Sequence, residues 1–380
     1  MAYFLPYHNH RGEEMDTLHI KGAPNYYQCR NGLLYDLFDL LQQHQFNQLL
    51  VIHGDQSWAK VKTYFADPAL PCQFIAYNGE CSHHEVERIA KLTKSETTAV
   101  IGIGGGKILD IAKACGDRLT LPTILIPTLA SNCAPWTPLS VFYDQNGNFQ
   151  EYIIFNSSTY MLLVDPNVIL DSPRAYLRAG IGDTIAKWYE ADVLTRELPE
   201  KPVSLDIALY AAKLCRDVLI DEGEVALAAI DQQSYNHSFL RSIETIIMAG
   251  GMVGGFGDHY GRVSGAHSIH NGLTHLAETH DTLHGDKVAY GVLVQLAIEK
   301  RLDEVEKILP FYQRLQLPTS LHDIGVTEIT EEKVDLLSKG ATKPKESIHF
   351  MNVSDPNVVR EAVFQLEEFI RNNERNLNGV

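Results

Sequence analysis

The sequence predicts two domains: an α/β N-terminal domain built on a parallel sheet and an all-α C-terminal domain. In the first half, short apolar runs alternate with helical patterns, which is typical of a parallel sheet with helices on its faces. After Ser172-Pro173 nearly every pattern has the helical period of 3.6 residues. The chain of 380 residues also exceeds what one core of ~250–300 residues supports. We therefore expect domains at residues 1–172 and 173–380.

The N-terminal strands and helices follow from the spacing of apolar residues. Buried strands are predicted at Gln48–His53, Gln73–Tyr77, Ala99–Ile103, Thr123–Ile126 and Thr159–Asp165. Helices are predicted between them at Leu33–Gln43, His84–Lys94 and Lys107–Arg118. This order of elements indicates a Rossmann-like domain. Leu139–Tyr143 and Tyr152–Phe155, joined by the turn Asp144–Gly147, are expected to form a hairpin.

The C-terminal domain is predicted to be helical throughout. Ser172 is expected to cap its first helix, with Pro173 at the first helical position. The predicted helices cover Ala175–Leu194, Leu205–Ile220, Ser238–Met252, Val288–Lys300, Leu302–Leu315, Glu331–Leu337 and Asn357–Asn372.

Composition and charge exclude several classes of protein. A net charge of −16 disfavours nucleic acid and anionic membrane surfaces as partners. The six cysteines show no CxxC spacing, which is typical of a reduced, cytoplasmic protein. The first sixteen residues contain no apolar run typical of a secretory signal. The apolar runs are interrupted by Gly, Pro or charge, and we expect none to reach the ~20 residues of a membrane helix.

A glycine-rich turn suggests dinucleotide binding. Gly104, Gly105 and Gly106, followed by Lys107, end a predicted strand and open a helix, where backbone N–H groups can bind a pyrophosphate. The turn matches neither GxGxxG nor a Walker A loop, so an ordinary strand-to-helix turn is an equal alternative. Asp55, after an earlier strand, could accept hydrogen bonds from an adenosine ribose. It favours NAD, with some use of NADP left open.

Asp183, His267 and His284 are the candidate metal ligands. Two imidazoles and one carboxylate are a common set for a catalytic divalent metal, with positions left open for substrate. No pair among them has the i, i+4 spacing of a helical metal motif, and with 16 histidines in the chain surface or packing roles are the alternative. The glycines between Gly250 and Gly257 suggest a close helix crossing or, alternatively, a phosphate cradle.

Six segments in order resemble the iron-containing alcohol dehydrogenase superfamily, with its dehydroquinate synthase-like fold. They are IGIGGGKILDIAKA (101–114), IPTLASNCAPWTPLSVFY (126–143), GIGDTIAKWYEA (180–191), AHSIHNGLT (266–274), LHGDKVAYGVLVQL (283–296) and ESIHF (346–350). The similarity is closer to the glycerol dehydrogenase-like arm, and NCAPWTPLSVFY looks like its hydroxycarboxylate dehydrogenase members. Together these segments specify the family far better than any one of them.

The resemblance implies a metal in a cleft between the domains, held by Asp183, His267 and His284, with zinc expected rather than iron. It implies cofactor contacts through the glycine-rich turn and through other residues of the N-terminal motifs. These residues are Asp55, Gly106, Lys107, Asp110, Thr128, Ser131, Thr137, Leu139 and Tyr143. The family's members are commonly homo-oligomers that act on small-molecule substrates.

Two departures from the family pattern bear on the substrate. Cys133 stands where glycerol dehydrogenases carry an aspartate that contacts the polyol, and Lys187 stands where iron-binding alcohol dehydrogenases carry a histidine ligand. Losing an anion and gaining a cation favours a carboxylate-bearing substrate, a 2-oxo or 2-hydroxy acid. As an alternative, Lys187 is a surface residue or pairs with Glu190.

The implied reaction is reversible hydride transfer between nicotinamide and a carbonyl carbon. His270, one helical turn from His267, is the candidate proton relay, with water as its rival. Glycerol dehydrogenase activity is the nearest alternative function, favoured if Asn132 or Thr137 replaces the missing hydrogen-bond acceptor. A cyclase or lyase of the same fold and a non-catalytic binding protein are more distant alternatives.

Overall fold

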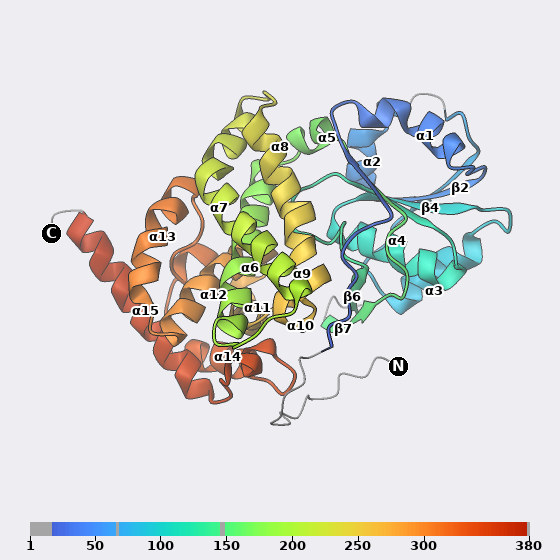
Figure 1. The fold of residues 1–380 in the computed structure, drawn as a ribbon. Coiled ribbons are helices and arrows are strands. Elements are labelled where there is room, and N and C mark those ends of the chain that lie inside the picture. Colours follow the sequence, from blue (N-terminus) through green and yellow to red (C-terminus); the bar gives the residue numbers. More distant parts are fainter. Residues whose placement is uncertain (1–16, 66–67, 145–148, 378–380) are drawn as a thin grey trace. The chain divides into compact units, whose positions relative to one another are not determined.

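The computed structural model describes residues 17–65, 68–144 and 149–377, which form two compact units (Figure 1). The first unit contains the residues up to Leu129 together with Ala134–Ile169 and Pro199–Asp206. The second contains Ala130–Cys133, Leu170–Leu198 and the residues from Ile207 onward. The division expected at residue 172 makes each domain one continuous segment. In the structure, Ala130–Cys133 belongs to the second unit and Pro199–Asp206 belongs to the first.

The first unit contains the predicted parallel sheet. Its six strands are β1 (Tyr26–Cys29), β2 (Leu49–His53), β3 (Cys72–Ala76), β4 (Ala99–Gly104), β5 (Thr123–Pro127) and β8 (Met161–Val164). They lie in the order β1-β8-β5-β4-β2-β3, and every neighbouring pair is parallel. The sequence prediction missed only β1, because this short edge strand is half-buried throughout and contains no continuous apolar run.

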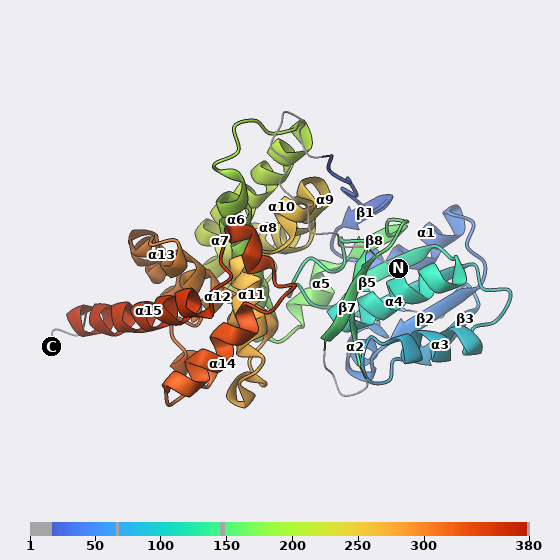
Figure 2. The same cartoon turned by 90° about the horizontal axis from the view of Figure 1, so that it is seen from below.

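Helices cover both faces of this sheet. They are the 3₁₀ turn Leu33–Asp36, α1 (Leu37–Gln43), α2 (Asp55–Val61), α3 (His83–Leu92), α4 (Gly106–Leu119) and α5 (Pro166–Leu170). On one face, residues of α1 and α2 pack with odd-numbered residues of β2 and β4 such as Val51 and Ile101. On the other face α4 lies close to Gly102 of β4. A Cβ atom on Gly102 would lie 2.5 Å from the Cβ atom of Ala112 in α4. Figure 2 shows α3 beside α4.

The predicted hairpin is present as an antiparallel pair. Its strands are β6 (Leu139–Tyr143) and β7 (Phe149–Ile154), with Val141 paired with Tyr152. Residues 145–147 of the predicted turn lie outside the described residues.

The second unit is helical, as predicted. Its helices are α6 (Arg174–Thr195), α7 (Val203–Asp231, whose first residues belong to the first unit), α8 (His237–Glu244), α9 (Gly250–Gly257), α10 (His259–Arg262), α11 (Gly265–Leu273), α12 (His284–Ile298), α13 (Leu302–Leu315), α14 (Glu331–Ala341) and α15 (Pro356–Leu377). The prediction missed α10 and α11, since α11 contains two glycines and several polar residues instead of a long apolar stripe.

The start of α6 differs from the prediction. The helix begins at Arg174, Pro173 precedes it as the N-cap residue, and no side chain provides a capping hydrogen bond. The predicted cap by Ser172 is therefore wrong. Gly180 and Gly182 lie within α6 and are buried.

Two glycines of α12 bring α6, α11 and α12 into backbone contact. A Cβ on Gly285 would lie 1.8 Å from the carbonyl oxygen of Ala179 in α6. A Cβ on Gly291 would lie 2.3 Å from the carbonyl oxygen of Ala266 in α11. Since backbone atoms cannot withdraw as a flexible side chain can, both crossings require glycine.

The segment His237–Gly257, made of α8, a π-helical turn and α9, is long and apolar enough to cross a membrane. The expectation that no apolar run reaches this length is wrong for this segment. However, 67% of its apolar window is buried inside the structure, as expected of a core helix.

We expect Gly291→Ala to lower the free energy of unfolding by about 1–3 kcal/mol, because the new methyl group must push α11 and α12 apart. Gly254→Ala in α9 is the matched control, since the nearest atoms to its Cβ would lie 3.6 Å away. Alanine there should leave stability unchanged or raise it by up to ~1 kcal/mol. Urea unfolding followed by circular dichroism would measure both, and equal effects at the two positions would contradict the role of the crossing.

Candidate functional site

Three helices of the second unit bring Asp183, His267 and His284 together. One possible ligand atom from each lies within 4.8 Å of the other two. Asp183 Oδ1 is 3.2 Å from His284 Nε2 and 3.4 Å from His267 Nε2. The close packing of α12 against α6 at Gly285 and against α11 at Gly291 makes this possible, because each helix carries one of the three side chains.

Glu190 orients His267. Its Oε2 lies 2.8 Å from His267 Nδ1, and its Oε1 accepts hydrogen bonds from the backbone N–H groups of Ser264 and His267 at 2.7 and 3.0 Å. A carboxylate can only accept, so His267 Nδ1 carries a proton and donates it. In the neutral imidazole, Nε2 then presents a lone pair to Asp183.

A chain of three hydrogen bonds orients His284 in the same way. Asn271 Nδ2 donates to Glu346 Oε2 at 2.9 Å, so Asn271 Oδ1 accepts from His270 Nδ1 at 3.0 Å. His270 Nε2 is therefore the acceptor for His284 Nδ1, 2.9 Å away. This assignment leaves the Nε2 lone pair of His284 facing Asp183.

The converging lone pairs fit a divalent cation. The Asp183 oxygen lies 3.2 and 3.4 Å from two imidazole nitrogens, and a positive charge must stabilise this arrangement. Without a metal, a proton on His267 supplies that charge. Burial lowers the pKa of His267, but Glu190 and Asp183 outweigh burial and raise it to about 9. The donor set suits zinc or iron with open positions for substrate.

Lys187 is buried on α6, one turn after Asp183. Its side chain is 7% exposed and its Nζ donates to the carbonyl oxygen of Arg262 at 2.9 Å. The alternative of a surface lysine is therefore wrong. Burial lowers the pKa of Lys187, but electrostatic interactions with Cys133, Asp183 and Glu190 outweigh burial and raise it, so the side chain is a cation.

Cys133 belongs to the segment Ala130–Cys133, which packs on α6 within the second unit. A Cβ on Gly180 would lie 2.0 Å from the Ala130 carbonyl oxygen, so this glycine lets the segment approach the helix. The Cys133 side chain lies near Gly250 and Thr184, beside the turn that carries Asp183. Ser131, a predicted cofactor contact, lies on the same segment.

The other predicted cofactor residues lie in the first unit, several of them at the carboxyl ends of adjacent strands. Asp55 follows β2, Gly104–Lys107 follow β4, and Thr128 follows β5. The chain leaves β2 toward β3 and leaves β4 toward β5, in opposite directions along the sheet. Such a switch point is where open α/β sheets bind ligands. The fourteen-residue α4 begins there, with no side chain capping its N–H groups.

Lys107, Asp110 and Tyr143 have partners within the first unit. Lys107 forms an ion pair with Glu80 at 2.6 Å, and its Nζ lies 5.3 Å from the centre of the Tyr143 ring. Asp110 is buried and pairs with Lys113 at 2.9 Å.

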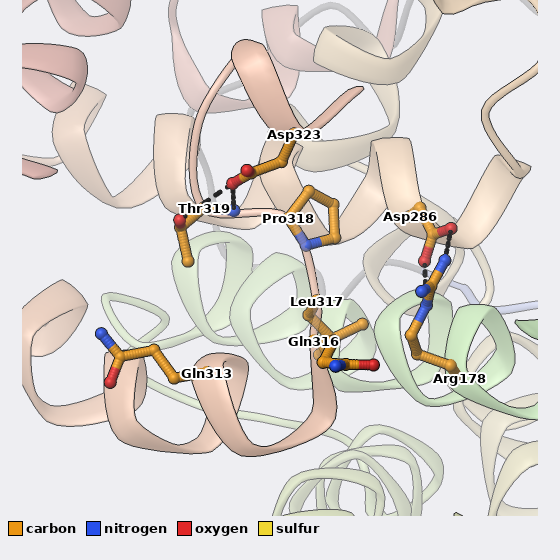
Figure 3. Close-up of a pocket in the computed structure, with 8 residues that line it drawn as sticks. All are labelled: Arg178, Asp286, Gln313, Gln316, Leu317, Pro318, Thr319 and Asp323. Carbon is orange, nitrogen blue, oxygen red and sulfur yellow. Dashed lines mark hydrogen bonds and ion pairs between the residues drawn. The ribbon is translucent and has the colours of Figure 1, made fainter. Parts of the chain in front are cut away.

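A cavity of about 310 Å³ in the second unit contains none of the predicted site residues (Figure 3). It is lined by Arg178, Asp286, Gln313, Gln316, Leu317, Pro318, Thr319 and Asp323. Arg178 of α6 donates two hydrogen bonds to Asp286 of α12, at 2.5 and 3.1 Å. The pair therefore ties the two helices together beside their crossing at Gly285.

Sequence reasoning missed Glu190, Asn271 and Glu346 as supports of the metal ligands. One signal was available for Glu190, because positions 183, 187 and 190 share one face of a helix. No spacing connects Glu346 with Asn271, 75 residues earlier, so only the fold reveals that contact.

Residues 24–166 match the family model described as iron-containing alcohol dehydrogenase. The chain is 40% identical to hydroxycarboxylate dehydrogenase A of Escherichia coli (strain K12), over 92% of this chain and 97% of that protein. It is 36% identical to a glycerol dehydrogenase of Pseudomonas putida, over 77% and 80% of the two chains.

The fold is similar to solved glycerol dehydrogenase structures. A probable glycerol dehydrogenase from Sinorhizobium meliloti 1021 superposes with a TM-score of 0.83 at 28% identity, covering 92% of this chain and 99% of that one. The Schizosaccharomyces pombe glycerol dehydrogenase gives 0.86 at 25% identity, covering 96% and 94%. The chain therefore belongs to the iron-containing alcohol dehydrogenase family, and it is an NAD(P)-dependent, metal-containing alcohol or hydroxyacid dehydrogenase.

Proposed function

We propose that the enzyme interconverts a 2-oxo acid and a 2-hydroxy acid by hydride transfer, with NAD and a zinc ion held by Asp183, His267 and His284. The observation that carries this proposal is the buried Lys187 ammonium, one helical turn from Asp183. The 40% identity to a hydroxycarboxylate dehydrogenase supports the same substrate class.

The surroundings of Asp183 suit a substrate carboxylate better than a polyol. Lys187 uses one N–H group on the Arg262 carbonyl, so its ammonium has further donors for an anion. Cys133 supplies no fixed carboxylate to repel that anion. A charge-assisted hydrogen bond from Lys187 would favour a substrate carboxylate over a neutral hydroxyl.

The protein's own groups would position the substrate and manage the proton. When bound, NAD supplies or accepts the hydride and the metal ion stabilises negative charge on the reacting oxygen. Glu190 holds His267, and the Glu346–Asn271–His270 chain holds His284, so the ligands need little reorganisation. His270, whose Nε2 accepts a hydrogen bond from His284 Nδ1, stays the predicted proton relay, with water as its rival.

A polyol substrate is the second candidate, favoured by the 36% identity to glycerol dehydrogenase. It would require another acceptor in place of the carboxylate absent at position 133. The cytoplasmic location, the homo-oligomeric assembly and the preference for NAD over NADP expected from the sequence stay predictions.

We expect the zinc-loaded enzyme to reduce 2-oxobutyrate or 2-oxoglutarate at least ten-fold more efficiently than dihydroxyacetone, a difference of ~1.4 kcal/mol in transition-state stabilisation. NADH oxidation with each substrate measures kcat/KM directly. Equal or better use of dihydroxyacetone would show that the enzyme is a polyol dehydrogenase.

We expect Lys187→Met to raise KM for a 2-oxo acid by more than ten-fold, because it removes the cation and keeps most of the side-chain volume. The control is a neutral ketone of similar size, whose KM should change little. If both substrates lose equally, Lys187 acts only by holding the Arg262 carbonyl, and the carboxylate-binding role is contradicted.

We expect Glu190→Gln to weaken zinc binding by about 10–100-fold, because the amide cannot replace the carboxylate that fixes the His267 tautomer. Competition with a zinc-binding dye measures the affinity. Glu304→Gln on α13 is the control, since Glu304 bonds Tyr189 and none of the ligands. Wild-type affinity in Glu190→Gln would contradict the proposed metal site.

A further inference from the structure

We propose that the buried Asp110–Lys113 pair positions the cofactor-binding segment, by latching residues 134–141 onto α4. This inference rests on the proposed placement of NAD at the carboxyl ends of β2, β4 and β5. It concerns Lys113, which forms an ion pair with one expected cofactor contact, Asp110, and binds the backbone of two others, Thr137 and Leu139.

Lys113 lies in the interior of α4, and its side chain is only 3% exposed. Its ammonium donates to the carbonyl oxygens of Ala134 at 2.8 Å and Thr137 at 3.1 Å, and to that of Leu139. The Asp110 carboxylate, one turn earlier, balances the charge at 2.9 Å. A buried ammonium is stable only with such a full set of oxygen partners.

Asp110 makes the remaining contacts of the latch. Its Oδ2 accepts a hydrogen bond from the backbone N–H of Val141 at 3.0 Å, and its backbone carbonyl accepts one from the Ser140 hydroxyl at 2.8 Å. Its buried Oδ1 faces the Lys113 ammonium in the ion pair and accepts no hydrogen bond, so both carboxylate oxygens are directed at groups of the latch. We therefore assign Asp110 to positioning, in place of the direct cofactor contact implied by the family resemblance.

The latch joins two sets of predicted cofactor contacts. Gly104–Lys107 lead from the end of β4 into the start of α4, whereas Thr137 and Leu139 lie on the segment that the latch holds, and Tyr143 follows it on β6. Residues 130–138 form no helix or strand, so tertiary contacts alone determine their path. Other hydrogen bonds hold the segment to other parts of the first unit: the Pro138 carbonyl accepts from the Phe155 N–H, and Trp136 Nε1 donates to the Gly22 carbonyl. Lys113 links the segment to α4. The relative placement of the two sets therefore depends on the latch.

The test compares Lys113→Met with Gly116→Ala. Gly116 lies near the opposite end of α4, where a Cβ would lie 2.0 Å from Thr123 Oγ1, so its replacement destabilises the same helix without touching residues 134–141. NADH affinity is measured by fluorescence titration, and amide hydrogen exchange is measured for residues 137–141. We expect Lys113→Met to weaken NADH binding at least ten-fold and to accelerate exchange in this segment, while Gly116→Ala changes neither beyond two-fold.

Kinetics supply a second readout. In Lys113→Met, KM for NADH should rise while KM for the carbonyl substrate stays within two-fold of wild type. Asp110→Asn, which preserves side-chain volume, covers the case in which Lys113→Met does not fold, and should weaken NADH binding several-fold.

Unchanged NADH affinity in the folded variants would overturn the latch, as would equal losses in Lys113→Met and Gly116→Ala. Failure of the proposed function would look different, because wild-type protein would then bind NADH but reduce no 2-oxo acid, or would bind no dinucleotide at all. Faster exchange confined to residues 137–141 would support the latch even then.

Discussion

Backbone contact between helices is the constraint on which the metal site depends. The carbonyl oxygens of Ala179 and Ala266 occupy the space where side chains of α12 would otherwise lie, at Gly285 and Gly291. Asp183, His267 and His284 come from three helices and have short side chains, so their ligand atoms meet only if the helices almost touch. Helices packed at the ordinary distance of 8–10 Å through larger side chains would separate them.

Buried charges give both units their local precision. In the second unit, Glu190 accepts three hydrogen bonds and thereby fixes the His267 ring. In the first, Lys113 donates to three carbonyl oxygens of one irregular segment. In both cases a single ion satisfies several backbone groups at once, and such a network tolerates few alternative arrangements.

The candidate metal ligands and the departures from the family pattern are different residues of this chain. The three metal ligands and the glycine-rich turn are what the family resemblance implies, whereas Cys133 and Lys187 depart from it. Both departures lie in the second unit, beside the turn of α6 that carries Asp183. Under the proposed function, a change of charge there would alter which substrate is tolerated and leave the candidate metal ligands unchanged.

The sequence alone determined the parallel sheet, the hairpin and nearly all the long helices, because alternating and 3.6-residue apolar patterns depend only on neighbouring residues. Its motifs also singled out Asp183, His267 and His284 before any geometry was known. Only the tertiary structure decided that Lys187 is buried, that Ser172 caps nothing, and that Glu190, Asn271 and Glu346 support the ligands. The physical reason is that a side chain's hydrogen-bond partner depends on how helices distant in sequence cross, which no local pattern encodes.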